Sequence, residues 1–423
     1  MSPRDLLLGS FHAALAAADP LKIVPSHLPP PPKGRTLVVG AGKAAASMAL
    51  AIEQNWPGNA PLDGLVITRY QHGLLTSRIN VIEAAHPVPD ESGEIAAHEI
   101  LKRVRTLTPN DLLLVLLSGG GSALLSLPAE GLEMEEIKAT TRELLKSGAP
   151  IQGMNTVRKH LSAIQGGQLA AAARSPVVAL IISDVTGDDP THIASGPCAA
   201  DPTTYQEALD ILQRYEVNAP RGVLDHLAQG AKKQIPETPK PGSRIFSRVE
   251  NRVIATAQQS LEAAAGFFAG QGIRPAILGD SVTGEASEVA RVYGALARQV
   301  KRHGQPWDPP VALISGGETT VTVRGKGRGG RCTEFLLSLG VDLAGTEGIH
   351  ALACDTDGID GSEDNAGALL APDSLKRAGK KKLEAASLLD SNDAYGFFSE
   401  LGDLVVTGPT RTNVNDYRAI LVL

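Results

Sequence analysis

The chain has 423 residues, 43% of them hydrophobic and 20% charged, which is enough for more than one globular core. Its net charge of −6 provides no broad cationic field, so we expect no binding to nucleic acid or to an anionic membrane, and no apolar run approaches the roughly 18 residues of a membrane span. The three cysteines, Cys198, Cys332 and Cys354, show no metal-ligand spacing and are typical of a reducing compartment, which predicts a cytoplasmic protein.

Apolar runs typical of strands alternate with amphipathic stretches typical of helices along the first half of the chain. In order, we predict a strand at 36–40, a helix at 43–54, a strand at 64–69, a helix at 92–107, a strand at 111–118, helices at 133–147 and 155–173, and a strand at 177–184. The strand-like runs lack a period of two, which indicates burial on both faces. This pattern predicts an α/β fold with a Rossmann-like, doubly wound and largely parallel sheet.

A polar segment with three prolines at 232–242 predicts an extended linker. We therefore expect two α/β domains, an N-terminal Rossmann-like domain at 1–235 and a smaller mixed α/β domain at 236–423. In the second domain the alternation resumes with a strand at 252–257, a helix at 257–271, a strand at 274–280, a hairpin at 311–323 and a strand at 351–358.

The sequence VVGAGKAAAS follows the first predicted strand, and its Gly40, Gly42 and Ala45 match the G-x-G-x-x-A pattern of dinucleotide-binding turns. The next predicted strand ends at Arg69, with no acidic residue to hold a ribose diol, which weakens a dehydrogenase interpretation without excluding an NADP-dependent reductase. Lys43 stands where the helix begins, so its ammonium and the free backbone N–H groups are placed to share one anion. A tight turn with an exposed lysine is the alternative.

A second glycine-rich turn, LLSGGGSALLSLP, follows the strand at 111–118. Three consecutive glycines let the backbone approach a ligand closely, and the flanking Ser118 and Ser122 add hydroxyl donors. A third turn, VRGKGRGGR, interleaves Lys326, Arg328 and Arg331 with glycines just before a predicted helix, which predicts a phosphate or carboxylate site. A solvated loop is the alternative, and the absence of G-x-x-x-x-G-K-[ST] argues against a P-loop NTPase.

Two acidic loops follow predicted strands. The first holds Asp184, Asp188 and Asp189, and the second, DTDGIDGSEDNAG, includes Asp355 and Asp360. Clustered carboxylates repel one another, and Mg²⁺ is a counter-ion that takes one or two carboxylates together with substrate phosphates. The second loop lacks the flanking helix pair and the terminal Glu of an EF-hand, so calcium is disfavoured. Aspartates that cap turns are the alternative, but glycine cradles, basic residues and acidic loops together favour phosphoryl transfer.

Six segments in this order, GAGKAAASMA, AHPVPDESG, LLSGGGSALLSLP, NTVRKHLSAIQGGQLA, SDVTGDDPTHIASGP and ISGGETTVTVRGKGRGGR, resemble the glycerate 2-kinase family, whose C-terminal part is called the MOFRL domain. The resemblance implies two α/β domains with the active site in the cleft between them. It also implies transfer of the γ-phosphoryl group of ATP to the 2-hydroxyl of D-glycerate, with Mg²⁺. The name hydroxypyruvate reductase, common in this family, is then a misreading of the glycine fingerprint.

The resemblance and the acidic loops together imply a set of site residues. Lys43, Arg331 and Asp189 are expected to be catalytic. Contacts with substrate or phosphate are expected from Ser118, Gly119, Gly120, Gly121, Ser122, Asn155, Arg158, Lys159, Ser315, Gly316, Gly317, Glu318, Gly327 and Arg328. Magnesium is expected at Asp184, Asp189, Asp355 and Asp360.

The chain departs from the family pattern in two places. It reads GGRCTE at 329–334 where relatives commonly read GGRNQE, and DGIDGSEDNAGA where they read DGTDGPTDAAGA, which leaves the acceptor and the rate open. We expect His86, His160 and His192 to be structural. The alternatives to a kinase are an NAD(P)H-dependent hydroxypyruvate reductase and a protein that binds an anionic metabolite without chemistry. The expected partner is D-glycerate, and a homodimer is a possible assembly.

Overall fold

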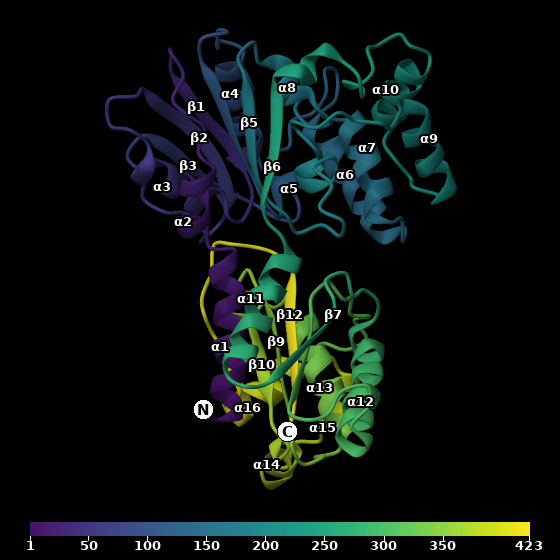
Figure 1. Cartoon of the computed structure of the whole chain (residues 1–423). Helices are drawn as coiled ribbons and strands as arrows, with labels where there is room; N and C mark the ends of the chain where they lie inside the picture. The colour runs from purple at the N-terminus through teal and green to yellow at the C-terminus, as the bar shows by residue number, and fades with distance from the viewer. The chain divides into compact units, whose positions relative to one another are not determined.

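The computed structural model describes all 423 residues, and the chain forms two compact units. The first unit is Pro20–Ile254, and the second unit joins Met1–Asp19 to Ala255–Leu423. Figure 1 colours the second unit green to yellow, together with the purple N-terminal helix. This division differs from the expected one at 235/236, because the boundary lies later and the N-terminal helix α1 (Pro3–Ala17) packs against α11 (Ala257–Gly270) in the second unit.

The proline-rich segment at 232–242 is not the link between the units. It belongs to the first unit, where the Thr238 hydroxyl donates to Asp201 at 3.0 Å and the Lys240 ammonium pairs with Glu237 at 2.9 Å. Its prolines keep the segment out of helices and strands, as expected, but side-chain hydrogen bonds hold it in place. The chain passes from one unit to the other at the end of β6 (Val249–Ala255).

The first unit contains a six-stranded sheet in the order β3-β2-β1-β4-β5-β6. Strands β3, β2, β1, β4 and β5 pair in parallel, which confirms the predicted Rossmann-like arrangement. Leu37 and Val39 pack into a core cluster with residues of α4 (Glu91–Val104), and Val38 on the opposite side of the strand is fully buried as well. The strand bounds are β1 Thr36–Ala41, β2 Leu62–Arg69, β3 Ile79–Ala84, β4 Leu112–Leu117 and β5 Val177–Ile182.

The helix predicted at 155–173 is two helices: the first ends at His160 and the second begins at Gln168, directly after Gly166 and Gly167, whose φ values of 58° and 81° are not helical. A separate apolar cluster is formed by helices alone, from α6, α7, α9 and α10. The helices of the first unit are α2 Pro20–Ile23, α3 Ala45–Asn55, α4, α5 Gly121–Leu124, α6 Met134–Lys146, α7 Ile151–His160, α8 Gln168–Ala172, α9 Tyr205–Arg214 and α10 Arg221–Ala231, with 3₁₀ turns at Val24–His27, Ile193–Ser195 and Arg244–Arg248.

The second unit contains a mixed six-stranded sheet in the order β11-β10-β9-β12-β8-β7, in which only β7 and β8 are parallel. The hairpin predicted at 311–323 does not form. After β8 the chain turns at Gly317, with φ 98°, and a side chain there would meet the backbone of Val282 at 2.3 Å. The strands are β7 Arg274–Gly279, β8 Val311–Ser315, β9 Ile349–Asp355, β10 Gly367–Leu370, β11 Leu404–Val405 and β12 Asp416–Val422.

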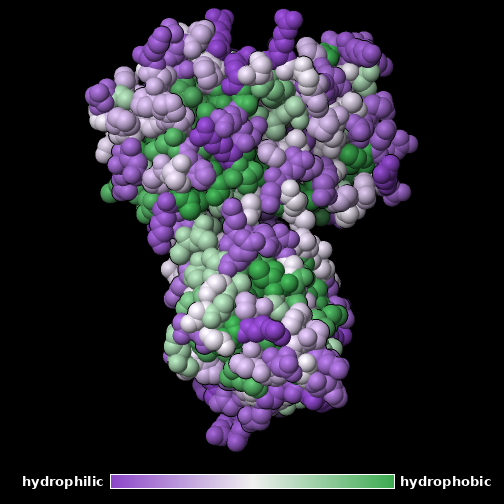
Figure 2. Space-filling model, in the orientation of Figure 1, coloured by the Kyte–Doolittle hydropathy of each residue, from purple (hydrophilic) through white to green (hydrophobic).

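Helices cover both faces of the second sheet. One core cluster joins α1 and α11 to the sheet, and another joins α12 (Ala286–His303), α13 (Arg331–Leu343) and α16 (Ala394–Leu401) to it. Two short helices complete the unit, α14 Ser374–Lys380 and α15 Ala385–Asp390. No single helix of the structure is long and apolar enough to cross a membrane, although the consecutive stretches Pro3–Ala17 and Pro20–His27 pass that test together by length and composition. Figure 2 shows hydrophilic residues over much of the surface of each unit, with apolar residues between them.

Candidate active site

The turn after β1 and the turn after β4 lie side by side in the first sheet. Strand order reverses between β1 and β4, and ligands of open α/β sheets bind at such a reversal, beyond the carboxyl ends of the strands. The Lys43 N–H donates to the Gly119 carbonyl at 2.8 Å, and the Ala44 N–H donates to the Ser118 hydroxyl at 3.0 Å. Ser118 is fully buried, so its expected role as a ligand donor is not supported, because its hydroxyl holds the start of α3.

Gly120 leaves the space in which two basic side chains meet. Its φ is 81°, and a Cβ atom at this position would lie 3.0 Å from Cδ2 of His86 and 3.6 Å from Cγ of Lys43. Gly121 is explained by packing, because a Cβ there would lie 2.6 Å from the side chain of Ala194. Gly120 therefore lets the turn pass close to Lys43, and the close approach of this turn to a ligand stays a prediction.

Helix α7 brings Asn155 and Arg158 to the same region. The hydroxyls of Ser122 and Ser195 lie 2.9 Å apart, Ser195 donates to the Asn155 side chain at 3.3 Å, and Arg158 donates to it at 3.4 Å. Arg158 forms no ion pair with a carboxylate, and burial lowers the pKa of its guanidinium. Its side chain lines a pocket together with Ser122 and Pro87. Arg158 is thus a half-buried cation without a carboxylate partner, which favours binding of an anion beside it.

Lys159 does not join this group. Its ammonium is buried and pairs with Asp201 at 3.2 Å, and Asp201 also accepts hydrogen bonds from Thr203 and Thr238. The expected contact between Lys159 and a ligand is therefore not supported. A buried lysine needs such a partner, and the pair fixes α7 against the segment at 232–242.

His86 lies among cations and stays neutral. Burial, together with the charges of Lys43, Arg69 and Arg158 and a smaller effect of His72, lowers the pKa of its ring to about 3. Sequence reasoning missed both His86 and Arg69 as site residues. A signal existed in part, because Arg69 ends β2 and His86 follows β3, so both stand at the carboxyl edge of the sheet.

The acidic loop after β5 places Asp184 and Asp189 at the same edge of the sheet. Asp189 is exposed and accepts a hydrogen bond from the Thr191 N–H at 2.8 Å. Partial burial favours its protonated form, but the hydrogen bonds from Thr191 outweigh that effect and lower the pKa of Asp189. No group of three or more His, Cys, Asp or Glu side chains in the chain is arranged to hold a metal by itself.

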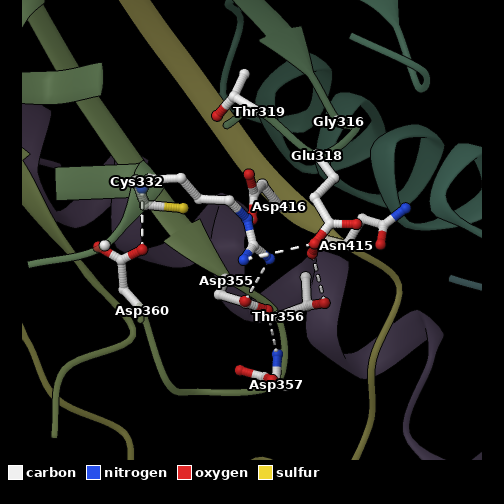
Figure 3. A network of polar contacts seen from close by, with 12 residues as sticks. Gly316, Glu318, Thr319, Cys332, Asp355, Thr356, Asp357, Asp360, Asn415 and Asp416 are labelled. Atoms are coloured by element: carbon white, nitrogen blue, oxygen red, sulfur yellow. Dashed lines mark hydrogen bonds and ion pairs between the residues drawn. The ribbon is translucent and has the colours of Figure 1, made fainter. Parts of the chain in front are cut away.

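Three carboxylates of the second unit, Asp355, Asp416 and Glu318, lie around one point in Figure 3. Arg331 contacts all three: its Nε donates to Asp416 at 2.8 Å, its Nη2 donates to Asp355 at 2.6 Å, and its Nη1 lies 3.6 Å from Glu318. Burial disfavours the charged guanidinium, but Asp416 and Asp355 outweigh it and raise the pKa of Arg331. The positive charge of Arg331, which was expected to face a ligand, is therefore neutralised by carboxylates of the protein. Of its three carboxylate partners only Glu318, with a side chain 57% exposed, lies at the surface.

Arg418, which the sequence did not indicate as part of the site, holds Asp416 and the turn after β8 in place. Its guanidinium is fully buried and donates to Asp416 at 2.5 Å and to the Gly316 carbonyl and Thr319 hydroxyl at 3.1 Å each. The turn after β8 is therefore fixed by hydrogen bonds from a buried side chain. Ser315, Gly316 and Gly317 are buried there, so of the four expected ligand contacts in this turn only Glu318 presents an exposed side chain.

Asp360 caps the start of helix α13. Its carboxylate accepts the N–H groups of Cys332 and Thr333 at 2.9 Å each and the Thr333 hydroxyl at 2.8 Å. These contacts give Asp360 a structural role at the helix start and do not support its expected role as a metal ligand. The departure to Cys332 and Thr333 is compatible with this cap, since the donors are two backbone groups and a hydroxyl. Burial raises the pKa of Asp360 to about 6.

The Gly/Arg loop packs against residues 391–395 of its own unit. Cβ atoms at Gly325 and Gly327 would lie 2.1 Å from the Ser391 carbonyl oxygen and 2.5 Å from Asp393. The guanidinium of Arg328 lies 4.7 Å from the centre of the Tyr395 ring and 3.6 Å from Glu363. Close packing within the protein explains these glycines, and the structure does not support Gly327 and Arg328 as an open anion cradle.

Glu334 contacts the segment that supports the Gly/Arg loop, and its ionisation is predicted to affect stability. Its carboxylate accepts a hydrogen bond from Asn392 at 3.2 Å, and burial raises its pKa to about 7, with Glu285 and Asp360 acting in the same direction. The folded state therefore holds this proton more tightly than the unfolded chain, so the unfolding free energy falls as pH rises from about 4.5 to about 7.

The variant Glu334→Gln keeps the acceptor for Asn392 and removes the ionisation. We expect the wild-type protein to lose stability relative to the variant between about pH 5 and pH 7, and the difference to stay constant above about pH 8. Urea unfolding at a series of pH values measures this difference. A difference that does not depend on pH would show that Glu334 titrates as an ordinary exposed carboxylate.

Two family patterns match the chain: Domain of unknown function (DUF4147) at residues 6–228 and MOFRL family at residues 311–416. A protein from Agrobacterium vitis with the provisional name hydroxypyruvate reductase is 50% identical over 425 residues, covering 100% of this chain and 95% of that one. Glycerate 2-kinase from Pyrococcus horikoshii is 40% identical, covering 90% of this chain and 86% of the relative. The crystal structure of glycerate kinase from Thermotoga maritima matches with a TM-score of 0.88 at 37% identity and covers 99% of both chains. This chain belongs to the DUF4147 and MOFRL family that includes the glycerate 2-kinases.

Proposed function

We propose that the protein transfers the γ-phosphoryl group of ATP to the 2-hydroxyl of D-glycerate and releases 2-phospho-D-glycerate and ADP. The observation that carries the proposal is the group of cations at the carboxyl edge of the first sheet, where Lys43 and Arg158 flank the glycine turn and no carboxylate pairs with Arg158. Both substrates are anions, and relatives named glycerate 2-kinase and glycerate kinase cover most of this chain.

Phosphoryl transfer depends mainly on positioning and on stabilising charge, so the contribution of the chain is electrostatic. We assign to Lys43 the contact with the transferred phosphoryl group, because its side chain lies over Gly120. Arg158 is assigned to an anionic group of either substrate. We assign to Nη1 of Arg331 a contact with an anionic ligand group. Its present partner, Glu318, is exposed, so a ligand can displace this carboxylate easily.

Magnesium is proposed to arrive with the nucleotide. Because Mg²⁺ usually takes one or two carboxylates together with phosphates and water, a cluster of three protein carboxylates is not required. Asp184 and Asp189 suit this donor set, since Asp189 is exposed and both stand on the loop after β5. When bound there, the ion would neutralise phosphate charge. Asp360 is used by the helix cap and Asp355 by Arg331, so neither is assigned to the metal.

A hydroxypyruvate reductase is disfavoured by the start of α3. In dinucleotide-binding folds the backbone N–H groups at this helix start hold the pyrophosphate. Here the N–H groups of Lys43 and Ala44 already donate to Gly119 and Ser118. In addition, β2 ends at Arg69, which provides no acceptor for a ribose diol. The side chain of Lys43, not a row of free backbone donors, is what this turn offers to an anion.

A coupled assay with ATP, Mg²⁺ and D-glycerate tests the proposal. The product is fed to enolase without phosphoglycerate mutase, so that only the 2-phosphate gives a signal. We expect a signal that requires all three components. Release of ADP without an enolase signal would mean another position or another acceptor, whereas oxidation of NADPH by hydroxypyruvate in the absence of ADP formation would refute the kinase.

A further inference from the structure

We infer that His86 is a ligand-binding residue, whose neutral imidazole donates a hydrogen bond to the oxyanion that occupies the space over Gly120. The chemistry of the ligand group is that of a carboxylate or a phosphate, and the carboxylate of D-glycerate and a phosphate of ATP are its two sources. The inference deepens the proposed function and rests on it for the identity of the substrates. It assigns to the first unit a contact that the family resemblance does not imply.

The first reason is the place of the ring. His86 follows β3, and its Nε2 would lie 3.2 Å from a Cβ atom at Gly120, while the Lys43 side chain approaches the same point. The imidazole therefore reaches the glycine turn at the position where the sheet order reverses. A side chain at Gly120 would occupy the space that a ligand between these groups needs.

The second reason is that the ring has no partner in the protein. Two other histidines of the first unit do have one: Nδ1 of His160 lies 2.8 Å from the Thr156 carbonyl, and Nδ1 of His72 lies 3.1 Å from the Tyr70 carbonyl. None of the hydrogen bonds and ion pairs of the structure involves the ring of His86. The half-buried imidazole therefore has a hydrogen-bonding nitrogen that the protein does not use, and a ligand group can take the place of water there.

The third reason is the charge of the surroundings. The groups with the largest electrostatic effect on His86 are Lys43, Arg69, Arg158 and His72, all of them basic. These cations and burial lower the pKa of the ring to about 3, so the histidine is neutral near neutral pH. A neutral ring adds a hydrogen-bond donor to the cationic group without adding repulsion, and a bound oxyanion raises its pKa.

The test is nuclear magnetic resonance of the imidazole nitrogens in the full-length protein, at about pH 6, with the His86 signal assigned by the variant His86→Gln. Spectra are recorded for the free protein and after addition of inorganic phosphate, D-glycerate, or ATP without magnesium. We expect a neutral ring in the free protein and a shift of the His86 signal on saturation with at least one of these probes. A shift with D-glycerate alone identifies the carboxylate, and a shift with ATP or phosphate alone identifies the phosphate.

A His86 signal that does not move with any of the three probes would overturn the inference, as would a ring that is already charged in the free protein at about pH 6. Kinetic variants add a second measurement. His86→Ala is expected to raise the KM of the substrate identified by the spectra about 10- to 100-fold, as for loss of a hydrogen bond to a charged group, with an unchanged melting temperature. The control His98→Gln changes an exposed histidine on α4 and should have no effect. If the enzyme assay fails but phosphate shifts the His86 signal, the proposed reaction is wrong and the oxyanion site remains.

Discussion

Replacing Lys43 by methionine is expected to lower kcat/KM for phosphorylation of D-glycerate by about 100- to 1,000-fold, the loss typical of removing one charge-stabilising group from an active site. Methionine keeps most of the aliphatic stem, which passes 3.6 Å from the position of a Cβ at Gly120, and removes only the ammonium. Because the charge stabilises the transferred phosphoryl group more than the bound substrate, the loss should appear mainly in kcat.

The matched control is Lys102→Met, which removes an ammonium that is 71% exposed on α4. Initial rates over a range of ATP and D-glycerate concentrations separate kcat from KM for both variants, and circular dichroism checks that the fold is kept. Equal activity of Lys43→Met and wild type would remove Lys43 from the reacting centre. An increase of KM alone would assign it to binding and not to the transition state.

Replacing Asp416 by asparagine is expected to lower the unfolding free energy of the second unit by about 3–5 kcal/mol, as when one partner of a buried ion pair is removed. Asp416 is fully buried and accepts from Arg331 at 2.8 Å and from Arg418 at 2.5 Å. Asparagine leaves the buried guanidinium of Arg418 without its carboxylate. The amide keeps one acceptor oxygen, so one of the two arginines also loses its hydrogen bond at this position, while Arg331 still pairs with Asp355.

The measurement is urea unfolding followed by the fluorescence of Trp307, which packs against the core of the second unit, in a background where Trp56 of the first unit is replaced by phenylalanine. The matched control Glu288→Gln breaks the ion pair of Glu288 with Arg291 at 2.9 Å, in which both side chains are more than half exposed, and is expected to change stability by less than about 1 kcal/mol. A loss for Asp416→Asn as small as that of the control would mean that the buried pair does not stabilise the unit.

Local patterns in the sequence were sufficient for the fold class and for most elements of the first unit. The apolar run at 111–118 became β4 (Leu112–Leu117), and the turn at 118–122 lies at the reversal of strand order. Strand β3 (Ile79–Ala84) was not predicted, because its sequence INVIEA alternates with polar residues and it stands at the edge of the sheet. His86, which follows that strand, was expected to be structural, because a single histidine near a loop carries no sign of its neighbours.

The site could be predicted only in part, because the sequence around a charged residue does not show which other side chain will pair with it. Lys159 and Arg158 are neighbours on α7, yet Lys159 is neutralised by Asp201 and Arg158 by no carboxylate. Arg331 was expected to hold a free charge, but Asp355 and Asp416 come from two other strands of the sheet. These partners are 42, 24 and 85 residues away along the chain, so no local pattern reveals them.

The sequence by itself determined the α/β class and the two turns at Gly40–Lys43 and Ser118–Ser122, because apolar periodicity and glycine act over a few residues. The kinase family followed from the resemblance of six short segments to that family. Only the tertiary structure decided which polar groups remain for a ligand. Asp360 caps a helix and Lys159 forms an ion pair with Asp201. His86 and Arg158, in contrast, have no carboxylate partner. The physical reason is that burying a polar group requires a partner, and folding chooses that partner from residues distant in the sequence.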